Sequence, residues 1–320
     1  MFKGKQKGSQ ARAVRRKGKE AAIILALLLG TVSGRAAIAI DGFSSDANDR
    51  FANNAASFIG ANYNWSGVGR TTSSRWGTLV SRNVFISANH YHPAVDSLFE
   101  FYPDNDPNAT PVTRTVASGQ RIGTSDVWVG VLSTPVPESI ATYDFPNEQI
   151  NNFTEFTHSS IYEEVAWMWG LSPTVFSVPT DMAVGRNMLD NWYDHDTNPD
   201  DTLGDDAIMA VRNLSGDKNY VSYEAYLQSG DSGGPLFTLD TDDQLLLTGI
   251  NWFIDQDVLI PGLGSRDISG FSYLGNYAND IQTIINAHPV PEPEISGMFV
   301  GIVVMTVGIF RRRQKTNRSS

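Results

Sequence analysis

The segment with the clearest chemical potential is a serine set among glycines, Gly230-Asp231-Ser232-Gly233-Gly234-Pro235. Glycines leave the serine hydroxyl open to close approach and allow the positive backbone angles that turn amide groups toward a bound carbonyl. Acyl transfer needs such a nucleophile beside backbone donors that stabilise an oxyanion. The same residues also suit a tight turn between two strands, so a base and an orienting carboxylate elsewhere must decide.

Histidine is the side chain that titrates near neutral pH and so suits the general base. The chain has five: His90, His92, His158, His195 and His288. His288 follows a predicted terminal helix and His195 lies in an acidic segment, which favours surface positions for both. His90 and His92 would share one face of a strand, and periodicity alone does not choose between them.

Composition indicates a globular, strongly acidic body. The 320 residues are 41% hydrophobic and include no cysteine, so packing rather than disulfides must hold the fold. Residues 38–293 contain 10 Lys and Arg against 33 Asp and Glu. A surface this negative repels phosphates, which excludes nucleic acid as a partner.

The first 37 residues are typical of a secretory signal peptide. Eight Lys and Arg between residues 3 and 19 precede an apolar run at 21–30, and small residues follow at Ala36, Ala37 and Ala39. We therefore expect signal peptidase to process the chain. Cleavage at these alanines would leave Ile38 or Ile40 at the new N-terminus.

The remaining pattern is mostly that of β-strands. Strong helical periodicity is missing from the first half, and apolar runs bounded by turn residues recur along the chain. Predicted strands lie within 76–90 (two, separated by 81–83), 125–132, 220–223, 235–239 and 244–253. A short helix is predicted within 46–59 and an amphipathic one over 276–288.

Between Asp190 and Asp206 the chain is acidic and rich in turn residues. Carboxylates at this density could bind calcium, but their spacing fits no EF-hand loop. A solvated surface loop is the favoured interpretation, and we predict no metal site.

The C-terminal segment 289–320 combines Pro289-Val-Pro-Glu-Pro293, an apolar stretch at 295–310 and Arg311-Arg312-Arg313. Sixteen helical residues span about 24 Å, somewhat short of a ~30 Å hydrocarbon core. A simple membrane anchor is one interpretation. The order of parts, however, resembles the PEP-CTERM sorting signal of Gram-negative-type bacteria. That resemblance implies cleavage by an exosortase, membrane attachment only through this helix before processing, and delivery to the periplasm, cell surface or extracellular matrix.

Several segments resemble the trypsin-like (chymotrypsin-fold) serine proteases. Gly77-Thr78-Leu79-Val80 and Ile86-Ser87-Ala88-Asn89-His90 match the strands that lead to that family's histidine. Asp126 heads an alternating apolar run like the one that carries the family's aspartate, and Gly230–Pro235 matches the nucleophile motif at all six positions. The order His, Asp, Ser is that of the chymotrypsin group. The resemblance spans about residues 70–288.

The resemblance implies a role for each residue. Ser232 would be the nucleophile, His90 the base, and Asp126 the group that holds the imidazole. The amides of Gly230 and Ser232 would form the oxyanion hole. Asp231 would pair with the amino group of a freshly exposed Ile38 or Ile40. An equal alternative is that groups within the fold pair with the Asp231 carboxylate. No cofactor is implied.

The implied fold is all-β: two antiparallel six-stranded barrels packed together, with a closing C-terminal helix. Residues 38–135 would form the first barrel with His90 and Asp126, and residues 136–288 the second with Ser232. Tyr226 and Trp252 take the family's specificity-pocket positions. Because Tyr226 stands where trypsins have aspartate, a preference for Arg or Lys is not supported.

These observations predict an exported serine endopeptidase that acts on protein or peptide substrates. Three alternatives remain: a non-catalytic binding module on the same fold, a serine esterase, and a structural surface protein with accidental motif matches. The first would be signalled by loss of a triad residue, and none is lost. Acyl transfer to water does not distinguish an ester from an amide, so the second stays open.

Overall fold

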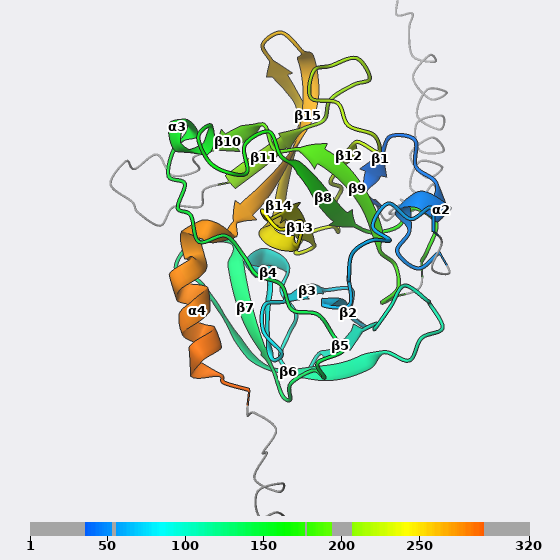
Figure 1. The fold of residues 1–320 in the computed structure, drawn as a ribbon, viewed down its shortest axis with the longest axis vertical. Coiled ribbons are helices and arrows are strands. Elements are labelled where there is room, and N and C mark those ends of the chain that lie inside the picture. Colours follow the sequence, from blue (N-terminus) through cyan, green and yellow to red (C-terminus); the bar gives the residue numbers. More distant parts are fainter. Residues whose placement is uncertain (1–35, 53–55, 177, 194–206, 291–320) are drawn as a thin grey trace, which may run out of the picture. The chain divides into compact units, whose positions relative to one another are not determined.

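The computed structural model describes residues 36–52, 56–176, 178–193 and 207–290 (Figure 1). Every pairing between its named strands is antiparallel. The strands are β1 Ala39–Ile40, β2 Val68–Thr71, β3 Trp76–Leu79, β4 Val84–Ala88, β5 Leu98–Phe101, β6 Val112–Arg121, β7 Val127–Leu132, β8 Val165–Gly170, β9 Ala183–Met188, β10 Asn191–Tyr193, β11 Ala207–Val211, β12 Ala225–Tyr226, β13 Pro235–Leu239, β14 Leu245–Ile260 and β15 Gly264–Tyr273. The helices are α2 Ser45–Asn48, η1 Asn89–Tyr91, α3 Phe153–Phe156, η2 Leu274–Tyr277 and α4 Ala278–Ala287.

The first half of the body forms a closed six-stranded barrel in the order β2-β3-β4-β7-β6-β5. Every residue of β4 and of β7 is buried, as expected for the apolar runs VFISA and VWVGVL. The turn between β3 and β4 is closed by a hydrogen bond of 3.0 Å from the Val80 amide to the Val84 carbonyl. The strands predicted within 76–90 and 125–132 are therefore confirmed.

The second half forms a seven-stranded sheet, in the order β10-β11-β15-β14-β13-β8-β9. Its end strands β10 and β9 make no strand pairing with each other in the described residues. The structure thus shows a mostly β fold with one closed barrel, where two were expected. The difference lies in the pairing of the end strands, which an alternation of apolar residues does not specify.

Two local predictions fail and one holds. Residues Tyr220–Tyr223 were predicted as a strand but form a turn, in which Tyr223 has a φ of 61°. Of the described residues within 46–59, only those up to Asn48 are helical, in the single turn α2, which is capped by the Ser44 hydroxyl. The terminal amphipathic helix is confirmed as α4, which buries Ile281 and Ile284.

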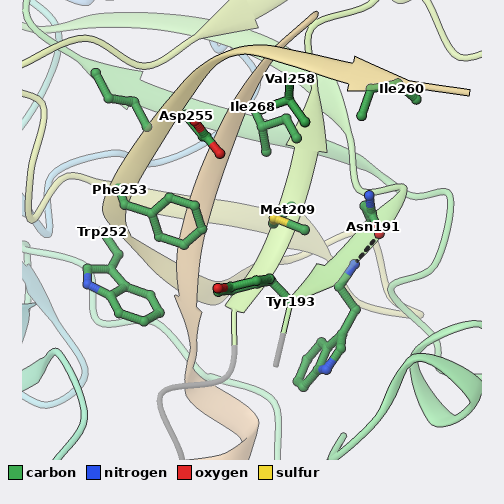
Figure 2. A pocket seen from close by; sticks show the side chains of 11 residues that line it. Asn191, Tyr193, Met209, Trp252, Phe253, Asp255, Val258, Ile260 and Ile268 are labelled. Carbon is green, nitrogen blue, oxygen red and sulfur yellow. Dashed lines mark hydrogen bonds between the residues drawn. The ribbon is translucent and has the colours of Figure 1, made fainter. Parts of the chain in front are cut away.

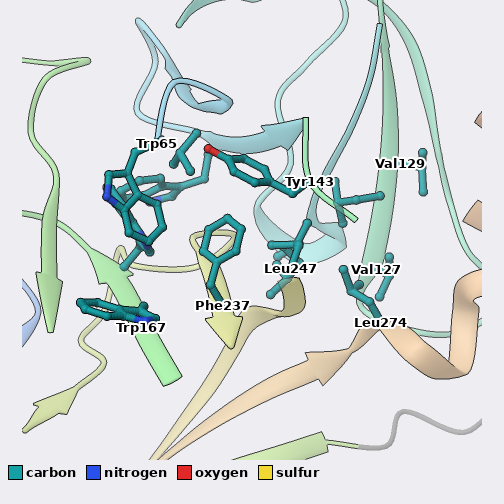
Figure 3. Close-up of a cluster of buried hydrophobic side chains, with 14 of the residues drawn as sticks. Trp65, Val127, Val129, Tyr143, Trp167, Phe237, Leu247 and Leu274 are labelled. Atoms are coloured by element: carbon teal, nitrogen blue, oxygen red, sulfur yellow. The ribbon is translucent and has the colours of Figure 1, made fainter. Parts of the chain in front are cut away.

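One hydrophobic cluster joins the barrel to the sheet (Figure 3). Val127 and Val129 of β7 belong to it together with Trp167, Phe237 and Leu247 from β8, β13 and β14. Aromatic edge-to-face contacts strengthen it: the rings of Trp65 and Phe237 lie 5.4 Å apart, and those of Tyr143 and Phe237 4.8 Å apart. The barrel and the sheet therefore share this cluster, although each also buries a hydrophobic cluster of its own.

Several predicted features fall outside the described residues: the signal peptide up to residue 35, most of the acidic segment (194–206), and the sorting segment from residue 291. In the part of the chain that is described, no helix has the length and apolar character needed to cross a membrane.

Candidate active site

His90 and Asp126 are brought together by the pairing of β4 with β7. The register places Ala88 opposite Val127, so the residues just after β4 meet the residue just before β7. The His90 amide donates to Asp126 Oδ1 at 2.8 Å, and His90 Nδ1 lies 2.6 Å from Asp126 Oδ2. An ionised carboxylate only accepts hydrogen bonds, so Nδ1 carries the proton and Nε2 is left as a base.

The two side chains differ in solvent access. Asp126 is 6% exposed, whereas the His90 ring is 42% exposed. The carboxylate is thus buried and hydrogen-bonded to the His90 amide, whereas the His90 side chain is partly open to solvent. His92, the rival candidate, instead stacks on Trp128 with ring centroids 4.7 Å apart and hydrogen-bonds the Pro93 carbonyl through Nδ1. Of these two histidines, His90 is the one in contact with a carboxylate.

Ser232 lies in a loop between β12 and β13 that packs against the end of β4. Gly230 and Gly233 adopt left-handed angles, with φ of 103° and 82°. A Cβ added to Gly233 would lie 3.0 Å from Ser87 Oγ and 3.3 Å from the Ala88 amide nitrogen. The loop therefore touches β4 two residues before His90, and only glycine permits this contact. In the described residues no hydrogen bond joins the Ser232 hydroxyl to the His90 ring.

The amides of the loop fall into two groups. Those of Asp231, Gly233 and Gly234 donate to the carbonyls of Gln228, Asn251 and Asp231, at 3.0–3.1 Å. Those of Gly230 and Ser232 donate to no backbone carbonyl in the described residues. The Ser229 amide likewise has no such acceptor there, so the two amides predicted to form an oxyanion hole are among those that the loop leaves available.

Asp231 points away from the surface into the protein. It is 1% exposed, and its two oxygens accept hydrogen bonds of 2.7 Å from the amides of Leu171 and Gln228. Burial raises its pKa to about 7, while the two amide donors and the nearby Arg70 oppose that shift. An additional positive charge would stabilise the ionised form.

Ile38 lies beside this carboxylate. A Cβ added to Gly170 would come within 2.6 Å of Ile38 Cβ and 2.7 Å of Asp231 Cγ. Both side chains therefore lie next to Gly170. Ile38 is 1% exposed, and its amide donates to the Leu171 carbonyl at 3.1 Å. Its neighbours Ala39 and Ile40 form β1, which pairs with β12 ahead of the Ser232 loop.

A cavity of about 160 Å³ adjoins Ser232. Trp252, one of the two predicted specificity residues, lines it together with Gln228 and Ser229. Tyr226 does not: it is 1% exposed and pairs with Ala39 across β1 and β12. The side chain predicted at the base of the specificity pocket is therefore buried behind its wall. The cavity has room for a small side chain.

Sequence reasoning missed the structural importance of Asn251. Its Nδ2 donates to the carbonyls of Trp169 and Asp231, at 2.7 and 2.9 Å, and the side chain is buried. A polar residue inside the apolar run of β14 was the available signal, since buried polar groups in strands usually satisfy a neighbouring backbone.

The described residues contain no group of three or more His, Cys, Asp or Glu arranged to hold a metal ion. Asp190 lies at the described edge of the acidic segment and accepts hydrogen bonds of 3.2 Å from the Val211 amide and from Asn219. Burial raises the pKa of Asp190.

A search with protein-family models finds no match to this chain, and neither does a search of curated proteins.

Proposed function

We propose that this chain is an exported serine endopeptidase of the chymotrypsin-like type. The observation that carries the proposal is the doubly hydrogen-bonded His90–Asp126 pair at the end of β4, against which the Ser232 loop packs through Gly233. A base, a group that orients the base and a candidate nucleophile thus come from separate segments to one edge of the barrel.

The proposed reaction follows from these positions. Ser232 Oγ attacks the carbonyl carbon of the scissile bond while its proton passes to His90 Nε2. The resulting oxyanion accepts hydrogen bonds from the amides of Gly230 and Ser232. As the carbon–nitrogen bond breaks, the imidazolium returns the proton to the departing amine. Water then attacks the acyl-enzyme with the same base, releasing the acid and restoring the Ser232 hydroxyl. The reaction requires no cofactor.

The finer fold assignment belongs to this proposal. We interpret the seven-stranded sheet as the counterpart of the second barrel of the chymotrypsin-like fold. Support comes from its antiparallel strands, from α4 at the end of the body and from the close approach of β9 to β11 across the sheet.

Export and processing form a further part of the proposal. We assign residues 1–37 to a signal peptide removed by signal peptidase and residues 289–320 to a sorting segment cut by an exosortase. The mature protein would then act in the periplasm, at the cell surface or in the matrix. Of the two candidate N-termini, Ile38 is favoured, because it is the one beside Asp231. Sequencing the ends of the secreted protein tests this assignment.

The function is tested by exposing the wild-type chain and Ser232→Ala to a fluorophosphonate serine-hydrolase probe and, separately, to casein. Labelling and casein cleavage that both disappear in Ser232→Ala are the expected result. Labelling without cleavage of any peptide would indicate an esterase. Absence of both from a folded protein that starts at Ile38 would indicate a binding module and overturn the proposal.

A further inference from the structure

A second and larger cavity, of about 600 Å³, lies between β10, β11 and the long hairpin of β14 and β15 (Figure 2). Its walls are mainly apolar: aromatic rings line one side and aliphatic side chains the other. Six of the lining residues are Tyr193, Met209, Phe253, Val258, Ile260 and Ile268. Asn191 and Asp255 supply the amide and the carboxylate among the side chains that line it.

The hairpin gives this cavity its shape. β14 continues well beyond the residues that border Ser232, and its register shifts twice against β15, between Asn251 and Phe253 and between Asp255 and Val258. Irregularities of this kind bend and twist a strand pair. The outer part of the hairpin thereby curls over β11, where Val258 and Ile260 pack against the buried residues Met209 and Ile268.

This cavity adjoins the same stretch of β14 as the one beside Ser232. Trp252, Phe253 and Ile254 line both. Three strand residues cover about 10 Å, which is also the length of about three residues of an extended peptide. A peptide held at Ser232 and running along β14 would therefore reach the larger cavity within two to four residues.

We propose that the larger cavity is a specificity site for a bulky apolar side chain, such as Phe, Trp or Leu, two to four residues from the cleaved bond of a peptide substrate. The inference rests on the proposed function. The three lining residues shared with the Ser232 cavity make the substrate itself the occupant, and the apolar walls select its side chain. Asp255 beside the opening repels acidic side chains.

The test compares two neighbouring hairpin residues. Val258 lines the cavity, whereas Leu259 is 78% exposed and does not. Val258→Asp places a charge in the cavity wall, and Leu259→Asp adds the same charge one residue away. Both variants and the wild type are prepared as proteins that start at Ile38 and are compared on fluorogenic peptides built around a bond that the wild type cleaves in casein. A single Phe is moved from four residues before this bond to four residues after it.

We expect Phe to raise kcat/KM over Ala by about tenfold or more at one position within two to four residues of the bond. Val258→Asp should bring this ratio close to one, with fluorophosphonate labelling and cleavage of the all-Ala peptide unchanged. Leu259→Asp should keep the wild-type ratio. Circular dichroism and thermal melting check that both variants are folded.

Other results would overturn the inference. An active, labelled wild type without a preference for Phe at any position means that the cavity does not select substrate. A preference that survives in Val258→Asp places the selecting site elsewhere. A change of oligomeric state in Val258→Asp with unaltered ratios means that a second copy of the chain occupies the cavity. Absence of labelling from the wild type overturns the proposed function itself, and the inference with it.

Discussion

The side-chain amide of Asn251 donates a hydrogen bond of 2.9 Å to the backbone carbonyl of Asp231, the residue immediately before Ser232. The same nitrogen also donates to the Trp169 carbonyl at 2.7 Å, and the Asn251 amide and carbonyl bond to Gly234 and Gly233. Asn251 thus fixes the Ser232 loop to β14 from both its side chain and its backbone.

We predict that Asn251→Asp disrupts this loop. The new carboxylate oxygen would face two carbonyls that now receive hydrogen bonds, and each buried carbonyl left without a donor costs about 1–3 kcal/mol. Fluorophosphonate labelling of Ser232 should be largely lost. Asn187→Asp is the control, because Asn187 is also buried but donates to the Ala225 carbonyl, outside the loop. Equal labelling of the two folded variants would contradict the prediction.

Replacing Gly233 should separate backbone strain from a steric effect. Gly233→Ala forces a side chain into left-handed geometry, at about 1–2 kcal/mol, and brings its Cβ to 3.0 Å from Ser87 Oγ. Gly216→Ala has similar strain, with a φ of 105°, but its Cβ meets nothing within 4 Å. We expect the two variants to lower the urea midpoint by comparable amounts. Only Gly233→Ala should also show a large loss of kcat/KM. If Gly216→Ala loses activity equally, contact with β4 is not what positions the loop.

The orienting role of Asp126 predicts a specific kinetic effect. Asp126→Asn removes the acceptor that fixes the His90 tautomer, so the ring can present a protonated Nε2 to Ser232. In a triad of this type such a change lowers kcat by about 10⁴. Steady-state kinetics with a small ester substrate measure it, and melting curves check the fold. A loss under tenfold would indicate that Asp126 only supports the backbone at His90.

The neighbourhood of Ile38 predicts dependence on the N-terminus. A protein that begins at Ile38 places an ammonium group near Asp231, whereas two added residues would carry that charge away. Leaving a buried charge without its partner costs about 3–5 kcal/mol, so kcat/KM should fall by roughly two orders of magnitude in the extended protein. Equal activities would mean that the amides of Leu171 and Gln228 satisfy Asp231 by themselves.

Glu224 predicts a pH effect on stability. It is 1% exposed, and burial raises its pKa to about 7 although the amides of Asn213 and Val221 donate to it. A carboxyl group whose folded pKa exceeds its unfolded value stabilises the fold below the unfolded pKa, near 4.5, and loses that contribution as pH rises to about 7. The difference is on the order of 3 kcal/mol. Urea unfolding between pH 4.5 and 8 should show a smaller decline for Glu224→Gln than for the wild type. The control Glu164→Gln, at an exposed position, should keep the wild-type slope.

The sequence predicts the local parts of this protein better than their assembly. The apolar runs at β3, β4, β7, β13 and β14 identify strands because burial of both faces needs continuous apolar residues. Tyr220–Tyr223 has the same apparent propensity but forms no strand, and Tyr223, in a turn, takes a left-handed angle that a strand does not contain. The choice of His90 over His92 needed a family resemblance, because only the register of β4 on β7 brings Asp126 to one of them.

The surroundings of the two proposed specificity residues also depend on pairing between distant segments, which a sequence pattern does not predict. Trp252 lines the small cavity, whereas Tyr226 does not, and the pairing of Tyr226 with Ala39 joins residues far apart in the chain. The larger cavity depends on register shifts in the β14–β15 hairpin, and the residue types in these strands do not predict those shifts.

The hydrophobic cluster shared by barrel and sheet has a consequence for the resistance of the protein to proteolysis. Because Val127, Trp167 and Phe237 belong to one cluster, neither half can open without exposing apolar surface of the other. We therefore expect cooperative unfolding in a single transition. Under the proposed function, the protein is an extracellular protease without disulfides that is exposed to its own activity, and self-digestion proceeds through partly opened forms. A core that removes such forms would lengthen the working life of each molecule.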